Sequence, residues 1–287
     1  MSACTPDAVV QTENIPTAGV RFINAVPDTA GAFGMDLRFV DILESNAHYR
    51  ITFRNGPSAK SPFVSTTIEF KGARAGSRRF RIFLDDTVQS VASTALYDTT
   101  VALTATHNYS AFLWGNARSA AADKMHLSFL DEVISNTDTT LVALRVVNAT
   151  QNPIDVTTYV QGTTPPVVPT WAAVPAFSAS SYIYVAPATM MYNVKPAGGA
   201  VALFADAQAM PGAPANCDLH FPCLPGEQPD IEAAPGTTVA GSGVSAIVFP
   251  SSSAGARTPQ TAPFTVPAIT FMWDRRPPRG CKPVLCG

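Results

Sequence analysis

The feature that most constrains the fold of this chain is a short phrase that occurs twice. The first copy reads Val-Arg-Phe-Ile-Asn-Ala at residues 20–25, and the second reads Leu-Arg-Val-Val-Asn-Ala at residues 144–149. Each copy is followed by an apolar–Asp–apolar run that opens a strand-like segment, at residues 35–37 in the first case and 154–156 in the second. A repeat at domain-sized spacing indicates that one scaffold has been duplicated.

The length of the chain agrees with two globular domains. Its 287 residues suffice for about two domains of roughly 150 residues, each able to bury its own core. The repeat places domain 1 at 19–134 and domain 2 at 141–274, and the short link between them limits hinge motion. The second copy carries an insertion at 200–235, which we expect to be a long exposed loop stiffened by proline. Residues 1–18 have the polar composition of a tether.

Period-two alternation predicts strands in both halves. Residues 80–84, 109–114, 182–185 and 244–249 are β-branched or aromatic runs bounded by turn-forming residues. The 25 prolines and 18 glycines leave little room for long helices, although residues 119–131 could form a helical turn. Short strands at intervals of about 8–12 residues are typical of sandwiches. We therefore predict an all-β chain of two tandem immunoglobulin-like antiparallel β-sandwich domains.

The chain carries few charges. Charged residues make up 14%, against a usual share of about 25%, and the net charge is −2. No positive field is available to attract nucleic acid, so we predict no nucleic-acid partner. No apolar run approaches the roughly 18 residues that a membrane-spanning helix needs, so we predict no transmembrane helix. A weakly charged surface suits a protein that works in contact with other proteins.

Four of the five cysteines form two close pairs. Five residues separate Cys217 from Cys223, and four separate Cys281 from Cys286. A zinc site would need all four thiolates, or thiolates with His220, and the spacings are not the C-x2-C of common zinc sites. We therefore expect two small disulfide loops, which form in an oxidising compartment. This places the chain in the periplasm or on the outer cell surface.

The fifth cysteine, Cys4, closes the tetrapeptide Met-Ser-Ala-Cys, which resembles a bacterial lipobox. In a lipobox the cysteine is acylated and becomes the mature N-terminus. Met stands here where Leu is usual, and the sequence does not include the basic and apolar stretches that normally precede the motif. Two interpretations remain open: a lipid attachment site at Cys4, and a solvent-exposed thiol near a chain terminus.

No arrangement of catalytic residues stands out. The four histidines are scattered without a ligand pair, and no Gly-x-Ser-x-Gly motif occurs. The adjacent acids Asp85-Asp86 and Asp131-Glu132 would point to opposite faces of a strand, which disfavours a shared calcium or acid–base site. We therefore predict that the protein is not an enzyme and has no catalytic, cofactor-binding or metal-binding residues.

The polar residues of the repeated phrase have structural explanations. Because Arg21 and Arg145 recur, we expect them to cover a sheet edge or to pair with Asp36 and Asp155, the acids of the segment that follows. Asn148 opens an Asn-x-Thr glycosylation sequence, but its place in the phrase favours an asparagine that holds a turn.

The C-terminal residues 275–287 form a basic, proline-stiffened arm after the last predicted strand. Aromatic and arginine side chains together are typical of interface hot spots. A disordered tail is the alternative, and the sequence does not separate the two. The predicted interface residues are Trp273, Arg275, Arg276 and Arg279.

The second copy resembles a known family. Its phrase at 144–149, Phe-Ser-Ala-Ser-Ser-Tyr at 177–182 and Met-Tyr-Asn-Val-Lys-Pro-Ala-Gly-Gly at 191–199 are similar to the bacterial extracytoplasmic domain of unknown function of the 4397 type. The likeness covers both halves and is weaker at 60–85, where the run Gly-Ala-Arg-Ala-Gly-Ser-Arg-Arg departs from a small-residue turn. The resemblance implies an immunoglobulin-like sandwich, often duplicated, on lipoproteins or secreted surface proteins, with no assigned catalytic residues.

Two functions fit these observations. The first is a non-catalytic structural or scaffolding subunit that docks on a membrane-associated complex through protein partners. By analogy, the complex to test first is the periplasmic face of a photosynthetic reaction-centre and light-harvesting assembly, because some phototrophic bacteria have an accessory β-sandwich subunit there. The alternative is a free-standing cell-surface lipoprotein that binds glycans or adheres through the aromatic strands of one sandwich face.

Overall fold

The chain is nearly all β in a computed structural model, with 49% strand and 3% helix. In the described part of the chain the helical elements are α1 (Gln89–Ala92) and the short 3-10 turn η1 (Phe53–Asn55). This confirms the all-β prediction. The structure describes residues 15–28, 34–39, 50–55, 70–84, 86–118, 124–217 and 231–278.

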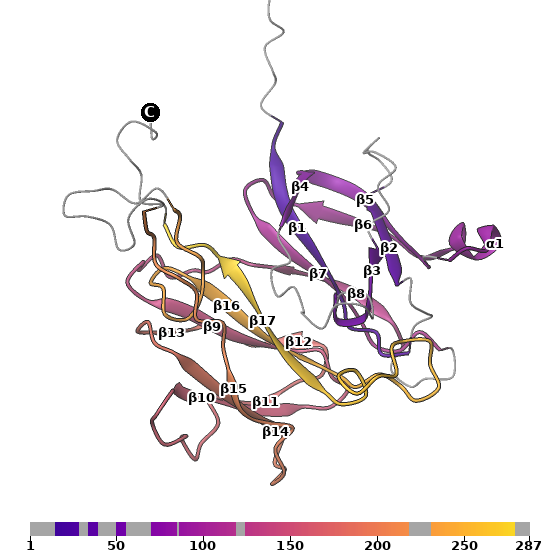
Figure 1. The fold of residues 1–287 in the computed structure, drawn as a ribbon. Helices are drawn as coiled ribbons and strands as arrows, with labels where there is room; N and C mark the ends of the chain where they lie inside the picture. Colours follow the sequence, from indigo (N-terminus) through magenta and orange to yellow (C-terminus); the bar gives the residue numbers. More distant parts are fainter. Residues whose placement is uncertain are drawn as a thin grey trace, which may run out of the picture.

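The strands of the first half form two four-stranded sheets (Figure 1). One sheet has the order β4-β1-β7-β8 and the other the order β3-β2-β5-β6. These strands are β1 (Thr17–Asn24), β2 (Met35–Phe39), β3 (Arg50–Ile51), β4 (Lys71–Arg74), β5 (Gly76–Leu84), β6 (Ala95–Leu103), β7 (Asn108–Trp114) and β8 (His126–Asp131).

The strands of the second half also form two sheets. One has the order β12-β9-β16-β17, with β13 also paired to β9, and the other has the order β11-β10-β14-β15. These strands are β9 (Val142–Asn148), β10 (Ile154–Val160), β11 (Trp171–Val174), β12 (Ser178–Ala179), β13 (Ile183–Val185), β14 (Met190–Pro196), β15 (Phe204–Gln208), β16 (Gly243–Phe249) and β17 (Ala268–Arg275).

The two halves share one strand order. Each has a parallel pair, β1 with β7 and β9 with β16, and its other pairings are antiparallel. In the register of these parallel pairs, Arg21 lies opposite Ser110 and Arg145 lies opposite Ser245. The repeated phrase therefore marks the same strand, beside the same neighbour, in both halves.

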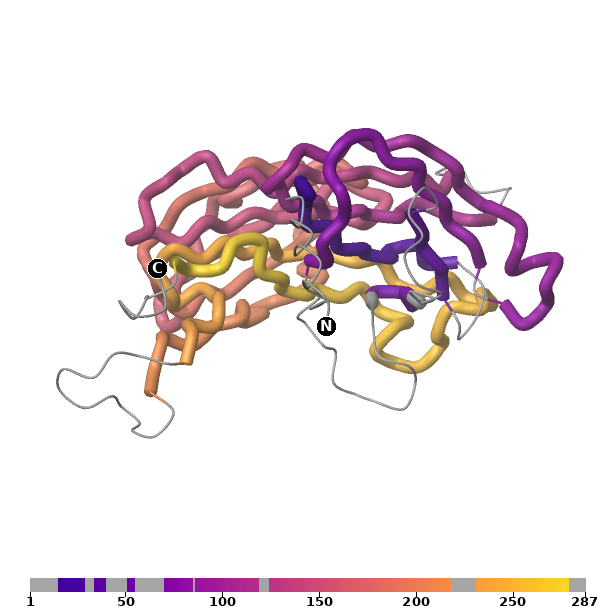
Figure 2. Tube along the Cα trace, turned by 90° about the horizontal axis from the view of Figure 1, so that it is seen from above, coloured from indigo at the N-terminus to yellow at the C-terminus, as the bar shows by residue number. Residues whose placement is uncertain are grey.

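The four sheets are stacked so that one sheet of each half lies at the centre of the molecule (Figures 1 and 2). Apolar cores fill the space between the two sheets of the first half and between the two sheets of the second half. A third core, which we call the junction core, joins β1 and β7 to β9, β16 and β17. The sheets β4-β1-β7-β8 and β12-β9-β16-β17 are therefore covered on both faces.

The sequence of β9 explains this arrangement. Leu144 and Val146 point into the core of the second half, whereas Val147 points into the junction core. Side chains alternate between the faces of a strand, and every residue of β9 is buried. A strand covered on both faces needs a nearly continuous apolar run, which is what the repeated phrase supplies around its arginine and asparagine.

Most of the predicted strands are confirmed, and two expectations need correction. The runs at 80–84, 109–114, 182–185 and 244–249 coincide with β5, β7, β13 and β16. The possible helical turn at 119–131 is wrong for its described C-terminal part, because His126–Asp131 forms β8. The expected loop insertion at 200–235 contains β15, which pairs with β14 and so belongs to the repeated sheet order.

Candidate functional site at the junction of the two halves

The arginines of the repeated phrase are buried between the two halves. Arg21 is 1% exposed and Arg145 is 4% exposed. Each donates from Nε to a serine on the neighbouring parallel strand: Arg21 to Ser110 at 2.6 Å and Arg145 to Ser245 at 2.7 Å. A buried guanidinium needs a compensating charge, so the carboxylates around it determine what this site can do.

Two buried carboxylates lie between these arginines. Glu132 follows β8 in the first half, and Asp274 lies on β17 in the second. Arg21 contacts Asp274 at 2.5 Å and Glu132 at 3.3 Å. Arg145 pairs with Glu132, and its Nε lies 3.7 Å from Asp274. We call these four residues the junction cluster, in which each arginine contacts a carboxylate of its own half and one of the other half.

An aromatic ring covers each arginine. Phe70 lies beneath Arg21, with 4.5 Å between guanidinium carbon and ring centre, and Tyr182 lies beneath Arg145 at 4.7 Å. The Tyr182 hydroxyl is 3.0 Å from an oxygen of Asp274 and 3.2 Å from one of Glu132. The two halves thus repeat a serine, an arginine and a ring, and the second half adds a phenol that can donate to either carboxylate.

The two carboxylates have opposite pKa shifts. Burial, followed by the charge of Asp274, raises the pKa of Glu132 despite the nearby arginines. Burial also acts to raise the pKa of Asp274, but Arg145 and Arg21 outweigh it and lower that pKa below its usual range. Burial and the charge of Asp274 raise the pKa of the Tyr182 hydroxyl, which therefore remains a donor. Asp274 is the firmly ionised acid of the cluster.

The junction cluster is closed rather than open to a substrate. Each carboxylate oxygen already faces at least one donor: Arg21 reaches one oxygen of each acid, and Tyr182 reaches the other oxygen of each. The four charged side chains are at most 5% exposed. Such a network fixes the relative position of the segments that carry it, and leaves no free position for a reacting group.

These contacts correct the expected role of the repeated arginines. They do not cover an edge, and they do not pair with the acids of the following segment. Asp36 accepts instead from Arg38 at 2.7 Å, and Asp155 accepts from the backbone N–H groups of Ala173 and Gly198. The reason is that β2 and β10 belong to the outer sheets, whereas the arginines point from β1 and β9 toward the junction.

Asn148 of the repeated phrase holds a turn, as predicted. The Asn148 side chain donates to the carbonyls of Asn152, Val174 and Pro175 at 2.8–3.1 Å and accepts from the N–H of Thr150. Asn24 makes bonds of the same kind. It donates to the Ile51 carbonyl at 3.0 Å and accepts from the N–H of Val26.

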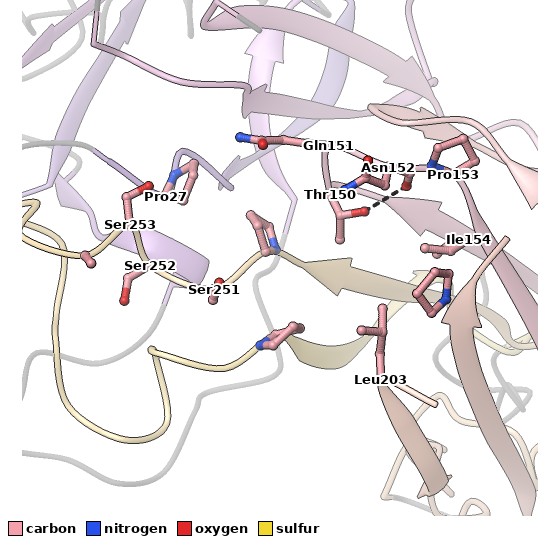
Figure 3. A pocket seen from close by; sticks show the side chains of 14 residues that line it. Pro27, Thr150, Gln151, Asn152, Pro153, Ile154, Leu203, Ser251, Ser252 and Ser253 are labelled. Atoms are coloured by element: carbon pink, nitrogen blue, oxygen red, sulfur yellow. Dashed lines mark hydrogen bonds between the residues drawn. The ribbon is translucent and has the colours of Figure 1, made fainter. Parts of the chain in front are cut away.

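A pocket of about 560 Å³ lies where the strands of the repeated phrase end, beyond the asparagines (Figure 3). Thr150 and Asn152 lie at its upper wall in this view, with Pro27 to one side and Leu203 to the other. None of the described residues that line it carries a charged side chain. Its lining residues are Pro27, Pro153, Pro196, Pro250 and Pro267, the polar residues Thr150, Gln151, Asn152, Ser251, Ser252 and Ser253, and Ile154, Leu203 and Ala254.

Arg54, which follows β3, holds one wall of this pocket in place. Its side chain donates to the carbonyls of Pro250 and Val266, both at 2.5 Å, and to that of Pro263 at 2.8 Å. Burial lowers the pKa of Arg54 to about 10. Its backbone φ is 59°, a region that side-chain-bearing residues seldom adopt. The first half thus clamps the β16–β17 loop of the second half.

The predicted interface residues are partly used inside the chain. Trp273 is 8% exposed and packs edge-on against Phe70 at 5.4 Å. Arg275 donates to the carbonyls of Gly241 at 2.8 Å and Asn136 at 2.9 Å. The Arg276 guanidinium lies over the Trp273 ring with 46% of its side chain exposed. Arg279 lies outside the described residues.

The cysteine predictions fall mostly outside the described residues. Cys217 is buried at 2% exposure. Its predicted partner Cys223, both members of the pair Cys281 and Cys286, and the predicted lipid attachment residue Cys4 are not among the residues described. Both disulfide loops and the lipid anchor therefore stay predictions.

Within the described ranges, no helix is long and apolar enough to cross a membrane. The same residues contain no group of three or more His, Cys, Asp or Glu side chains placed to hold a metal ion. Comparisons with protein-family models and with curated proteins found no match.

Proposed function

We propose that this chain is a non-catalytic, extracytoplasmic structural subunit that docks on a membrane-associated complex. In this proposal its two immunoglobulin-like sandwiches act as one rigid block. The observation that carries the proposal is the junction cluster, in which the charged side chains of both halves are buried against one another. A protein that changed shape between its halves would have to separate these charges.

The cost of such a separation supports a rigid block. Opening the junction would expose the apolar side chains of the junction core, among them Ile23, Phe112, Ile247 and Phe249, each at most 1% exposed. Burying one such side chain contributes about 1.5–3 kcal/mol. Breaking a buried ion pair adds about 3–5 kcal/mol. Together these terms make hinge motion at the junction costly and favour a fixed spacer over a moving clamp.

The proposed attachment has two elements that occur once in the chain. The C-terminal arm begins with Arg275 and Arg276, and the half-exposed guanidinium of Arg276 over Trp273 offers a cation beside an aromatic surface. Cys4 is the proposed acylation site. With these elements the chain resembles a periplasmic or surface lipoprotein subunit, and the photosynthetic reaction-centre and light-harvesting assembly is the complex that we propose testing first.

Isolation of the native complex tests this proposal. Mild-detergent extraction followed by native sizing should yield the chain in a stoichiometric assembly. Recovery as a lone species of 30.2 kDa would contradict it. The variant to compare is a truncation that removes residues 279–287, because Arg275 bonds to two carbonyls within the fold and a longer deletion would also weaken the fold. The truncated chain should keep its melting temperature and lose co-purification.

A second candidate function is glycan binding by a free-standing surface protein. The pocket near Thr150 favours it, because its described lining residues carry no charge and offer hydroxyl and amide groups, and its volume is within the usual range of about 300–1,000 Å³ for ligand sites. A glycan array with the purified chain, and with a Ser251→Trp variant that fills the pocket, separates the two functions. Binding that the tryptophan abolishes would favour the glycan function.

A further inference from the structure

The outer sheet of the first half ends in a long strand that has one neighbour within the described residues. This strand, β6, has nine residues and pairs there with β5 alone. The other edge strands of the two outer sheets, β3, β11 and β15, have two to five residues. A long edge presents a row of backbone N–H and C=O groups that can bond to another strand.

The sequence of β6 lacks the features that usually keep a sheet edge from pairing. It contains no lysine, arginine or proline, and its one charged residue is Asp98. The register with β5 shifts at Leu96, near the start of the strand, and is regular from Tyr97 to Leu103. The regular stretch is therefore shaped to accept a second strand.

The side chains of this regular stretch alternate between two environments. Tyr97, Thr99 and Val101 are half-buried, and the first and last of them pack against the cores of the first half. Asp98 and Thr100 are exposed on the opposite face. The apolar core thus reaches the edge of the sheet and is only partly covered there. A strand added beside β6 would complete its cover.

The exposed face beside the edge carries a fixed pattern of charge. Arg79 donates to both oxygens of Asp98, at 2.8 Å and 2.9 Å, and Arg81 donates to one of them at 2.9 Å. In the register with β5, Arg81 lies opposite Asp98 and Arg79 lies opposite Thr100. The hydrogen bond from Arg79 is the largest of the effects that lower the pKa of Asp98 to about 2. The carboxylate is therefore ionised at neutral pH, two positions from the neutral Thr100.

The regular stretch is complementary to itself when two copies run antiparallel about a twofold axis at Thr99. Thr99 then faces its own copy, and Tyr97 faces Val101 of the partner subunit. Threonine pairs, and pairs of an aromatic with a β-branched residue, are cross-strand contacts that stabilise sheets. Asp98 faces Thr100 of the partner subunit, so the two aspartates do not lie directly opposite each other.

We propose that β6 binds a second copy of the chain, so that two outer sheets join into one continuous sheet through antiparallel β6 strands. A twofold interface of this kind uses the same surface on both subunits. The pairing would bond backbone groups along both edges and cover the half-buried side chains of both strands. The inference is independent of the proposed membrane-associated complex, since it needs only the chain itself.

Sedimentation of the purified full chain tests the proposal. The unmodified chain should form a dimer whose share rises with concentration, and amide hydrogen exchange in β6 should slow as the dimer forms. Thr100→Asp places a carboxylate opposite Asp98 of the partner subunit at two symmetric positions, and should weaken the dimer about 2- to 30-fold. Thr100→Lys places an ammonium group there and should strengthen the dimer by a similar factor.

The matched controls are Thr164→Asp and Thr164→Lys, which make the same changes at an exposed threonine of the second half. They should leave the dimer unchanged, and circular dichroism should show every variant folded. A chain that stays monomeric at all concentrations would overturn the proposal, as would a dimer in which exchange in β6 does not slow. Weakening by both Thr100 variants would contradict the axis at Thr99. Failure of the co-purification test would leave these results unaffected, and the reverse also holds.

Discussion

Replacement of Asp274 tests the junction cluster most directly. Its oxygens accept from Arg21 at 2.5 Å, Ser245 at 2.6 Å and Tyr182 at 3.0 Å. Asp274→Asn keeps the shape of the side chain but leaves two buried guanidiniums facing one carboxylate, Glu132. Removing one partner of a buried ion pair costs about 3–5 kcal/mol. We expect a loss of that size in the free energy of unfolding.

Glu132→Gln is the matched control, because it makes the same chemical change at the other acid. Burial and the charge of Asp274 already push Glu132 toward its neutral form, so its amide should cost only about 1–2 kcal/mol. With about 2–4 °C per kcal/mol for a unit of this size, the Asn variant should melt about 6–20 °C lower and the Gln variant about 2–8 °C lower. Trp114 in the junction core provides the fluorescence probe. Equal losses, or a larger one at Glu132, would refute the reasoning.

The raised pKa of Glu132 also predicts the direction in which the stability of the chain changes with pH. A carboxyl whose pKa is higher in the folded state destabilises that state when ionised, so the contribution of Glu132 improves as pH falls through its folded pKa. The stability of the unmodified chain relative to Glu132→Gln should therefore rise between pH 7.5 and pH 5. Urea unfolding at the two pH values measures this difference, and a fall in it would contradict the assigned shift.

Three further predictions concern the polar groups that hold loops. Arg54→Met should expose residues 250–267 to faster amide hydrogen exchange while β9 stays protected, because the clamp on that loop is lost. Asn148→Ala should lower the free energy of unfolding by about 2–3 kcal/mol, since it leaves three backbone carbonyls without their donor; chemical denaturation measures this loss. Two backbone N–H groups lower the pKa of Asp155 in the folded chain. The stability that this carboxylate contributes is present above its unfolded pKa of about 3.9 and is lost as pH falls through the folded pKa. The melting temperature should therefore fall less below pH 4 in Asp155→Asn than in the unmodified chain.

The duplication of the strands could be predicted from the sequence because it depends on local patterns. The repeated phrase and the acid-opened run after it predict two consecutive strands in each half, and these strands occur as β1 and β2 and as β9 and β10, one in each sheet of its half. The same patterns identify Asn148 as a turn residue, since it bonds Thr150 and Asn152 a few positions away, although its bond to Val174 at the end of β11 spans 26 positions. Contacts between residues close in the chain can be predicted from the spacing of those residues in the sequence.

The carboxylates that pair with Arg21 and Arg145 could not be predicted from the sequence, because these pairings depend on how the sheets stack. Glu132 lies next to the exposed Asp131, and Asp274 lies between an aromatic residue and an arginine, so neither has the context of a buried acid. Arg21 contacts both acids only because its strand presents it on the face that packs against the other half. Arg54 shows the same limit. Its acceptors are backbone carbonyls about 200 positions later in the chain. Every residue has a backbone carbonyl, so the amino-acid sequence does not indicate which ones accept.

The closest physical analogue of the junction is the interface of a symmetric dimer. In a twofold interface each subunit presents the same patch, so a residue and its copy make reciprocal contacts. Arg21 and Arg145 do this: each bonds a serine on its parallel neighbour, lies on an aromatic ring, and contacts Glu132 and Asp274. One half alone would leave an arginine, an acid and half of the junction core exposed. The duplication therefore supplies the second surface that each half needs, and the repeated phrase is repeated because both copies face the same junction.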